Sequence, residues 1–450
     1  MTDRMGQVAD LKKVAILTTF DSYSEAYSLT RIASEQIKML VRHDYKPVVI
    51  VQDAFEPKKA FALSEVEIRR TPSVPCHNEI KKDETFDQDV DAVEKALDEA
   101  LKDIDVVLDH DVIYQNAALK YNFAARRIAK KYPNIKWLHW IHSATSPVTL
   151  DALRPIFTDA YLDLVKTPFP NSLYVFFNHY SIPRIAKDFN ISEELVKVVH
   201  HPSDVSEVLG LTPDVSKFMD DKEILKADAV CVYPARLDRG KNVEMAIKTM
   251  ACLKDFDLKP KMIVVDFHST GGDKVTYRDD LKNVAIDYGL SQDELIFTSE
   301  YQDSWTVEVP YPDTQAIMRL ANVFIMPSRS ESYSLITQEA GILKNVVILN
   351  FDFPPFRDIF GPNAIYRKYS SNIDVLSGLS GDTTTEYGPD RISADERVEH
   401  EKRYHLETAG MIASRLKHPE LALSTFLRKY RNLDYIFLHE LQPLFFEEVK

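Results

Sequence analysis

Glycine is the residue that this sequence most lacks. Only 12 of the 450 residues are glycine, and none lies between Gly6 and Gly210. Glycine-rich phosphate loops depend on this residue because it lets the backbone turn tightly and approach a phosphate closely. The first half of the chain therefore cannot contain such a loop.

Cysteine and long apolar runs are also scarce. The three cysteines, Cys76, Cys231 and Cys252, lack the spacing of metal ligands, which favours a reducing, cytosolic setting. No apolar run is long enough to span a membrane, and residues 1–10 lack the apolar core of a signal peptide. We therefore expect a cytoplasmic protein.

Basic residues are outnumbered by acidic ones. The formal net charge of −14 at pH 7 disfavours a general nucleic-acid-binding protein, although a local basic patch is compatible with it. The composition is otherwise that of a globular protein, with 45% hydrophobic and 28% charged residues. The length predicts two or three domains with large cores.

Short apolar runs alternate with helical segments along most of the chain. This rhythm predicts an α/β fold of doubly wound parallel sheets with helices on both faces. A helix is expected at 24–41, capped by Ser22 or Ser24, whereas residues 55–88 favour no element. Buried strands are expected at 14–19, 47–51, 105–108, 136–141, 173–177, 197–199, 229–233, 261–267, 294–298, 323–326 and 346–349.

The composition changes near residues 200–204, and a charged, irregular stretch that follows up to Lys226 separates two similar rhythms of strands and helices. We therefore predict one domain at 1–207 and a second at 208–420. The helical segment at 421–450 is expected to cross back to the first domain, and the polar residues 370–400 are typical of a loop or insertion.

Two basic residues follow the strand predicted at 229–233. Arg236 and Lys241 are expected on a strand-to-helix loop, where Gly240 permits a close turn and Asn242 can cap the next helix. Two fixed cations there suit a diphosphate, because arginine offers a planar fork and lysine a point charge. The alternative is that both are ordinary surface cations beside a turn.

Two glutamates mark a later strand-to-helix loop. Glu331 follows a predicted strand, and Glu339 lies in the helix after it. The backbone N–H groups at Ser334 and Leu335 would point into the same crevice and favour an anion. Carboxylates accept hydrogen bonds from vicinal hydroxyls, so the cluster predicts recognition of phosphates, sugar hydroxyls and ribose in one crevice.

These features together resemble the pattern of glycosyltransferase family 4 on the GT-B fold. That family carries an Arg and a Lys five residues apart after a strand, and then the motif P-S-x-x-E-x-F-G-L-x-x-x-E-A. Residues 327–340 read P-S-R-S-E-S-Y-S-L-I-T-Q-E-A. The match spans residues 229–350, whereas the first half matches mainly in rhythm. The resemblance implies two Rossmann-like domains facing across a cleft and retention of anomeric configuration.

The resemblance also implies roles for individual residues. Arg236 and Lys241 would bind the donor diphosphate, Glu331 would contact the transferred sugar, and Glu339 the ribose. The donor site would also include Tyr333, Ser334 and Leu335, and Arg236, Lys241 and Glu331 would take part in catalysis. Residues 1–207 would serve the acceptor and 208–420 the nucleotide sugar.

The sequence departs from the family at two places. Tyr333-Ser334 stands where the family has Phe-Gly, and serine does not enter positive-φ conformations freely. Asn350 and the residues at 351–355 replace a Gly-Gly pair near the donor sugar. Both departures concern the sugar and the acceptor rather than the diphosphate.

In the first half, His142 closes the strand predicted at 136–141. It resembles the family's histidine at that strand end and would act in catalysis by binding a sugar hydroxyl or shuttling a proton. The alternative is a structural strand-end histidine. His139 would face the same side but deeper, and His110 is a second candidate.

Two further groups suggest metal sites. Asp109-His110-Asp111 resembles the D-x-D motif of the other large glycosyltransferase fold, but it lies outside the expected donor domain. His200 and His201 are adjacent on an extended segment and would point opposite ways. We therefore expect no metal or other cofactor, because a GT-B enzyme neutralises the diphosphate with Arg, Lys and a helix N-terminus.

The helix predicted at 114–131 carries a run of basic residues. A solvated face is the plain interpretation. A weak contact with a polyanion, or with the inner face of a membrane, is the alternative. The residues are Lys120, Arg126, Arg127, Lys130 and Lys131.

We therefore expect a retaining, metal-independent glycosyltransferase that moves a sugar from a nucleotide-diphosphate sugar to a hydroxyl. The acceptor is left open among a small molecule, a glycan, a lipid and a modified nucleic-acid base, as is the oligomeric state. The alternatives are a non-catalytic nucleotide-sugar-binding or scaffold protein of the same fold, and a GT-B-fold epimerase or phosphorylase.

Overall fold

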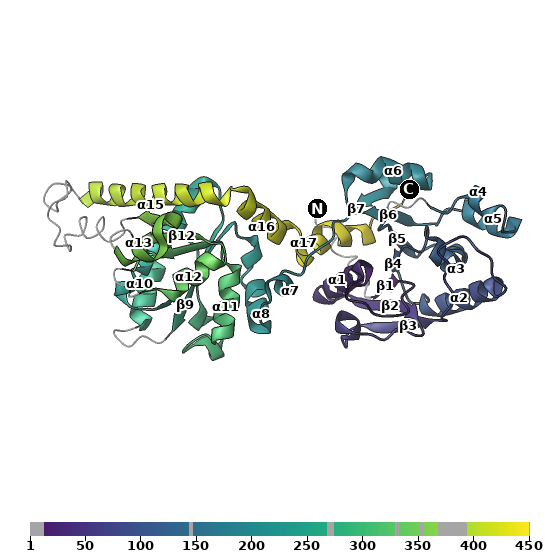
Figure 1. Ribbon diagram of the computed structural model, residues 1–450, viewed down its shortest axis with the longest axis horizontal. Helices are drawn as coiled ribbons and strands as arrows, with labels where there is room; N and C mark the ends of the chain where they lie inside the picture. The colour runs from purple at the N-terminus through teal and green to yellow at the C-terminus, as the bar shows by residue number, and fades with distance from the viewer. Residues whose placement is uncertain are drawn as a thin grey trace. The chain divides into compact units, whose positions relative to one another are not determined.

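The chain forms two compact units in a computed structural model (Figure 1). The first unit comprises Met1–Asp204 and Tyr430–Lys450, and the second comprises Val205–Lys429. The sequence places its divisions after residues 207 and 420 instead. The structure describes residues 13–143, 147–267, 274–328, 331, 333–350, 354–367 and 394–449.

The first unit is built on a seven-stranded parallel sheet in the order β3-β2-β1-β4-β5-β6-β7. Its strands lack polar alternation because both faces of the sheet are covered. The strands are β1 (Lys13–Leu17), β2 (Lys46–Gln52), β3 (Glu67–Thr71), β4 (Val106–His110), β5 (Lys136–Trp140), β6 (Ser172–Phe176) and β7 (Val196–Val198).

Alternate residues of β1 enter two different cores. Val14 and Ile16 pack with helix α1 (Ser28–Arg42) and the C-terminal segment. Ala15 and Leu17 pack with α2 (Phe86–Ala100) and α3 (Leu119–Lys131). Helices therefore cover both faces, as in a doubly wound sheet. The remaining helices before the unit boundary are α4 (Leu150–Leu153), α5 (Asp159–Lys166) and α6 (Ile182–Phe189).

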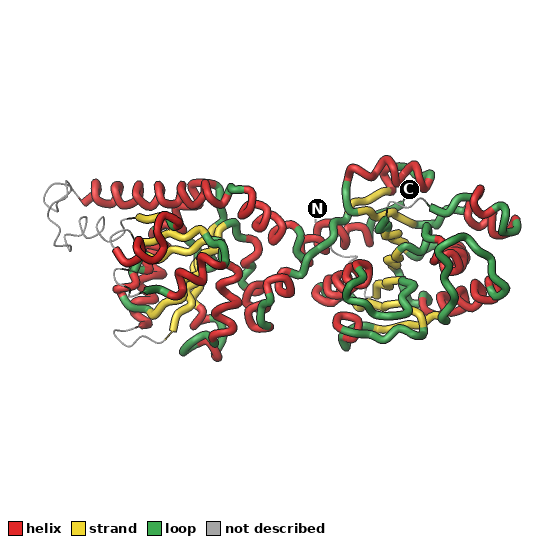
Figure 2. Tube along the Cα trace, in the orientation of Figure 1, coloured by secondary structure: helices red, strands yellow, loops and turns green. Residues whose placement is uncertain are grey.

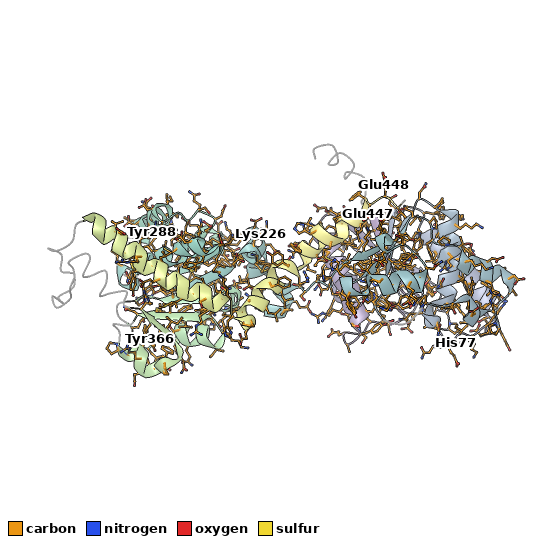
Figure 3. The ribbon with its side chains drawn as sticks, turned by 90° about the horizontal axis from the view of Figure 1, so that it is seen from above. His77, Lys226, Tyr288, Tyr366, Glu447 and Glu448 are labelled. Atoms are coloured by element: carbon orange, nitrogen blue, oxygen red, sulfur yellow. The ribbon has the colours of Figure 1, made fainter. Side chains whose placement is uncertain are left out.

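The C-terminal segment completes the core of the first unit. It comprises α17 (Leu433–Ile436), a π-helical turn (Phe437–Leu441) and α18 (Gln442–Phe445). Phe437 is fully buried and stacks on His43 with ring centroids 4.4 Å apart. Further along, Glu447, which is labelled in Figure 3, forms an ion pair with Lys197. This segment is therefore an integral part of the unit.

The second unit contains a six-stranded parallel sheet in the order β10-β9-β8-β11-β12-β13. Strand order reverses between β8 and β11, and helices lie on both faces of the sheet (Figure 2). The strands are β8 (Ala229–Arg236), β9 (Pro260–Phe267), β10 (Leu295–Phe297), β11 (Val323–Met326), β12 (Val346–Asn350) and β13 (Ile365–Arg367). The helices are α7 (Val205–Leu209), α8 (Pro213–Asp221), α9 (Val243–Ala251), α10 (Lys274–Asp287), α11 (Tyr311–Leu320), α12 (Leu335–Ile342), α13 (Pro354–Phe360), α15 (Ala394–Leu416) and α16 (Pro419–Tyr430).

The predicted fold class is confirmed, since each unit is a Rossmann-like domain with a parallel sheet, and the GT-B fold consists of two such domains. Among the described residues, no helix combines the length and the hydropathy needed to cross a membrane.

Several local expectations are wrong. Helix α1 begins at Ser28 behind Tyr27, which makes no side-chain cap, so neither Ser22 nor Ser24 caps it. Residues 55–88, left unassigned, contain β3 at the edge of the sheet. Helix α15 begins at Ala394, inside the loop expected at 370–400. The rest of that loop up to residue 393 lies outside the described residues, as do residues 351–353.

Candidate donor site and histidine cluster

The candidate donor site lies where the strand order of the second sheet reverses. Strand β8 pairs with β9 on one side and with β11 on the other. Strand β8 continues to Arg236, which pairs with Phe267 of β9, so Arg236 ends the strand instead of lying in the loop. The carboxyl ends of β8 and β11 therefore flank the crevice that forms at such a switch point.

Six of the predicted site residues line one cavity of about 390 Å³ at this edge. They come from the end of β8, from the turn after it, from the turn after β11 and from the start of α12. The sequence prediction that these loops converge is therefore met by the geometry. The six are Arg236, Lys241, Glu331, Tyr333, Ser334 and Leu335.

Opposite charges meet inside this cavity. The ammonium of Lys241 donates to a carboxylate oxygen of Glu331, and the side chains are 19% and 18% exposed. Such shielding strengthens their attraction compared with a surface pair. Because an ammonium has three donors, Lys241 can hold Glu331 and still donate to a phosphate oxygen.

The turn that leads into α12 has a strained backbone. Ser334 has φ 72° and ψ 77°, in the left-handed region where glycine is favoured. The serine that replaces the family's glycine thus takes up a glycine-like conformation, and its hydroxyl lies 2.8 Å from that of Thr337. The first N–H groups of α12, which have no partner within the helix, begin directly after it.

The turn after β8 differs from its prediction. Asn242, not Gly240, has the left-handed backbone, with φ 55°. Asn242 makes no side-chain cap to α9, and its Nδ2 instead donates to the Pro327 carbonyl at 3.2 Å. The loop that carries Lys241 is thereby tied to the end of β11.

Two further groups hold the strand ends, a role that was not predicted from the sequence. The buried Tyr233 hydroxyl lies 3.0 Å from the Ser328 hydroxyl and donates to the Lys241 carbonyl at 3.2 Å. Asn350, at the end of β12, donates through Nδ2 to the Ser328 carbonyl at 3.1 Å. A polar side chain that ends a buried strand, as Asn350 does, is the signal that could have identified this role.

Glu339 lies apart from the cavity residues. Its carboxylate accepts a hydrogen bond from Gln315 Nε2 at 2.9 Å and one from the Tyr311 hydroxyl at 3.5 Å. Both partners belong to α11, far from Glu339 in sequence. The carboxylate proposed to hold a ribose is thus oriented by a helix that the motif does not include.

His142 belongs to the first unit, at the carboxyl edge of its sheet. Its Nε2 lies 2.8 Å from Nδ1 of His110, and its ring stacks on that of His201 at 5.9 Å. Burial, and then the two neighbouring imidazoles, lowers the pKa of His142 to about 2. His142 is therefore neutral at physiological pH.

The backbone beside His142 is held by Tyr114. The Tyr114 hydroxyl accepts from the backbone N–H groups of His142 and Ser143 at 3.0 and 3.2 Å, and it donates to Asp111. Burial raises the pKa of the Asp111 carboxyl to about 6. Asp111 also has a left-handed backbone, with φ 62°.

The residues that suggested metal ligands have other partners. Asp109 forms a buried pair with His139, and His200 lies 3.0 Å from both carboxylate oxygens of Glu440. Within the described part of the chain, no group of three His, Cys, Asp or Glu residues is arranged to hold a metal ion.

Most basic residues of α3 are engaged by side chains of the same unit. Lys120 is buried and donates to Asp83 and Asp89 at 2.9 and 2.7 Å. Arg127 pairs with Asp91 and Glu94, Lys131 pairs with Asp98, and Arg126 donates to Asn122 and to the Thr167 carbonyl. The acidic residues around α2 thus neutralise much of this run, which weakens the case for a polyanion contact.

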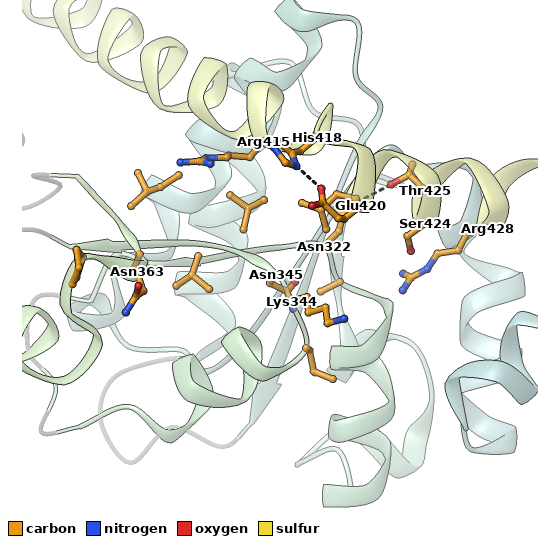
Figure 4. A pocket seen from close by; sticks show the side chains of 18 residues that line it. Asn322, Lys344, Asn345, Asn363, Arg415, His418, Glu420, Ser424, Thr425 and Arg428 are labelled. Carbon is orange, nitrogen blue, oxygen red and sulfur yellow. Dashed lines mark hydrogen bonds and ion pairs between the residues drawn. The ribbon is translucent and has the colours of Figure 1, made fainter.

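A second cavity of the second unit, of about 650 Å³, lies at the edge of its sheet opposite the candidate donor site (Figure 4). Asn322, Lys344 and Asn363 line it from the segments before β11, β12 and β13, and Arg415 and Thr425 line it from α15 and α16. None of the predicted site residues contributes to it. Because parallel sheets bind ligands at their carboxyl edge, we keep this cavity separate from the candidate donor site.

Comparison with known families bears on the second unit. Residues 214–371 match the family described as "Glycosyl transferases group 1". The second unit therefore carries a segment similar to group 1 glycosyl transferases. That segment includes every residue of the candidate donor site, whereas His142 and the rest of the first unit lie outside it. No curated protein matches the chain.

Solved structures give a weaker likeness over nearly the whole chain. A glycosyltransferase from Rickettsia africae is 12% identical, with 93% of this chain and 99% of that chain covered and a TM-score of 0.31. HepE from Anabaena, solved in complex with UDP, is 14% identical, with 96% and 98% covered and a TM-score of 0.30. A sucrose-phosphate synthase from Thermosynechococcus elongatus is 13% identical, with 92% and 99% covered and a TM-score of 0.28. Scores this low leave the fold to be judged from the topology of the two sheets.

Proposed function

We propose that the protein is a retaining, metal-independent glycosyltransferase that uses a nucleotide-diphosphate sugar and a hydroxyl acceptor. The observation that carries this proposal is the convergence of Arg236, Lys241, Glu331 and the start of α12 in one cavity. That cavity lies within the segment similar to group 1 glycosyl transferases. A cytoplasmic location is part of the proposal, supported by three free cysteines.

The cavity suits the leaving group of such a transfer. As the bond between the sugar C1 and the diphosphate oxygen breaks, negative charge develops on the diphosphate. Arg236, Lys241 and the first N–H groups of α12 supply fixed positive charge and hydrogen-bond donors where that charge develops, which is commonly the largest electrostatic contribution to catalysis. No metal ion is needed for this neutralisation.

The other predicted residues have roles in binding the donor and the acceptor. Glu331 holds a hydroxyl of the transferred sugar, and Glu339 holds the ribose diol. The acceptor oxygen bonds to C1 on the face that the diphosphate leaves, and the acceptor proton passes to a diphosphate oxygen. His142 accepts a hydrogen bond from the acceptor or sugar hydroxyl.

Donor binding tests the proposal. A panel of UDP-, GDP- and ADP-sugars is added to the full chain, and both the thermal-unfolding midpoint and calorimetric binding are measured. We expect one donor to bind and the Arg236→Ala variant to bind it about 10- to 100-fold more weakly, because a charge-assisted hydrogen bond contributes about 1.5–3 kcal/mol.

Arg239→Ala is the matched control for this experiment. Arg239 lies three positions further on, in the turn after β8, where it pairs with Asp280 at 2.5 Å and lies over Tyr277. Its removal should leave donor affinity unchanged. Unchanged affinity in Arg236→Ala would remove the basis of the proposal.

Product analysis separates the proposed reaction from its alternatives. Incubation with the bound donor and an acceptor panel should give a glycosylated acceptor with the donor's anomeric configuration, read by NMR. An epimerised donor indicates an epimerase, and a sugar phosphate formed with inorganic phosphate indicates a phosphorylase. Binding without turnover indicates a non-catalytic nucleotide-sugar-binding protein.

A further inference from the structure

A chain of hydrogen bonds runs through the first unit to His142. Gln36 on α1 and His110 at the end of β4 are both buried. Gln36 Oε1 lies 2.8 Å from His110 Nε2, and His110 Nδ1 lies 2.8 Å from His142 Nε2. Three side chains from separate parts of the sequence are thus connected end to end.

The chemistry of these groups fixes which atom donates and which accepts in each of the two hydrogen bonds. A neutral imidazole has one N–H donor and one acceptor nitrogen. Because the Gln36 oxygen can only accept, His110 donates from Nε2 and its Nδ1 must accept. His142 therefore donates from Nε2, and its Nδ1 is left with a lone pair.

Burial keeps the two imidazoles of this hydrogen-bonded series neutral. It lowers the pKa of His110 to about 3, with a smaller contribution from His201. At neutral pH neither His110 nor His142 carries the second proton that would turn both ring nitrogens into donors. The backbone N–H of His142 is held separately by the Tyr114 hydroxyl, so the residue is held both at its ring and at its backbone.

We propose that Gln36 and His110 are positioning residues that fix His142 in its Nε2–H tautomer, so that Nδ1 is a permanent hydrogen-bond acceptor for a substrate hydroxyl. This inference rests on the proposed function for the identity of the substrate, but the tautomer itself does not depend on it. His142 then orients the hydroxyl without exchanging a proton.

The tautomer is tested directly by NMR. Protein labelled with ¹⁵N-histidine is studied by long-range ¹H–¹⁵N correlation at neutral pH, and the signals are assigned with His110→Ala and His142→Ala variants. We expect both rings to carry their proton on Nε2. A proton on Nδ1 of His142, or a charged ring, overturns the proposal whether or not the protein transfers sugars.

The positioning role is tested by removing and restoring the acceptor on Gln36. Gln36→Met should give a mixed tautomer at His142 and lower kcat about tenfold, as expected for one lost hydrogen bond, with donor affinity unchanged. Gln36→Glu, which restores an acceptor oxygen, should recover both the Nε2–H signal and most of kcat.

Gln52→Met serves as the control. Gln52 is a buried amide of the same unit that donates to the Thr19 carbonyl at 3.0 Å, and among the described residues it has no hydrogen bond to an imidazole. We expect it to change neither the tautomer nor kcat relative to wild type. If Gln36→Met behaves like Gln52→Met at His142, Gln36 has no positioning role. If wild type transfers no sugar while the tautomer is as expected, the function fails and the inference about the ring stands.

Discussion

The two sheets share one strand order, apart from the additional strand β7 of the first, but their carboxyl edges differ in chemistry. The edge of the second sheet carries full charges, with Lys241 and Glu331 paired inside a cavity. The edge of the first sheet carries imidazoles that burial keeps neutral, with His110 linked to His142. The same position in a fold is thus equipped for opposite electrostatic tasks.

This difference separates two ways of handling a polar substrate. Fixed cations neutralise an anion as it forms, and they work best when water is partly excluded. Neutral imidazoles hold a hydroxyl without adding charge, provided that burial prevents their protonation. The fold fixes where each set of side chains lies, and the side chains decide which task the edge performs.

The largest expected effect comes from breaking the charged edge. Lys241→Met removes a cation from the proposed diphosphate site and leaves the Glu331 carboxylate without it. We expect kcat/KM for transfer to fall about 10²- to 10³-fold, since a preorganised group is lost where charge develops. Steady-state kinetics with the donor found by binding measures this change.

Lys248→Met provides a matched comparison. Lys248 forms an equally shielded ion pair with Glu401 in the same unit, with side chains 14% and 20% exposed, but it does not line the donor cavity. The free energy of unfolding of Lys248→Met should fall about as much as that of Lys241→Met, because each variant loses one shielded ion pair. Its kcat/KM should stay within about threefold of wild type. If the two variants lose activity alike, the charged edge has no special role.

The second prediction concerns the carboxyl edge of the first sheet, where a substitution removes the charge of Asp111. Burial raises the pKa of Asp111 to about 6 in the folded protein, compared with about 3.9 when unfolded. Above pH 6 the fold must hold a buried carboxylate, and as pH falls from 6 to 4 the folded state takes up a proton that the unfolded state does not. Asp111→Asn should therefore stabilise the protein by up to about 3 kcal/mol at pH 7.

The pH dependence distinguishes this cause from better packing. The stability gained in Asp111→Asn should shrink as pH falls from 6 to 4, which urea unfolding of variant and wild type at each pH will show. The buried histidines destabilise both proteins equally in acid, because the unfolded chain binds protons there, so their effect cancels in the difference. A gain that is constant with pH would contradict the titration of Asp111.

The smallest expected effect concerns Ser334, which precedes helix α12 at the candidate donor site. Ser334 has φ 72°, which costs a non-glycine residue about 1 kcal/mol or more. Ser334→Gly should relieve this strain, whereas Ser334→Ala keeps it and also loses the contact with Thr337. We expect the glycine variant to be more stable than the alanine variant by about 1 kcal/mol, measured by urea unfolding. Equal stability would show that the turn is not strained.

The strands could be predicted where the sequence is continuously apolar, and they were missed or shortened elsewhere. Val323–Met326 matches its prediction because all four residues are buried. Strand β3 was missed because Glu67 and Arg69 lie at a sheet edge, where only one face needs apolar residues. Strand β8 was ended too early because Pro234 suggests a break, yet it pairs within the sheet with Val265.

The residues of the candidate site that lie at or just after the ends of strands could be predicted from the sequence. Arg236, Lys241 and Glu331 follow strands, and parallel strands bring their carboxyl ends together. Gln36 and Gln315 could not be predicted, since each lies on a helix whose position against the site depends on tertiary packing. The backbone of Ser334 was expected to resist a positive φ, yet Ser334 has φ 72°.

The division of the first unit into two segments affects how the protein is made. Ile436, Phe437 and Leu441 are buried in the core that also contains Val14 and Ile16. A ribosome therefore completes the whole second unit before it supplies the side chains that close the first. The first unit therefore cannot finish folding until this segment is made, and until then the apolar side chains that the segment covers are exposed.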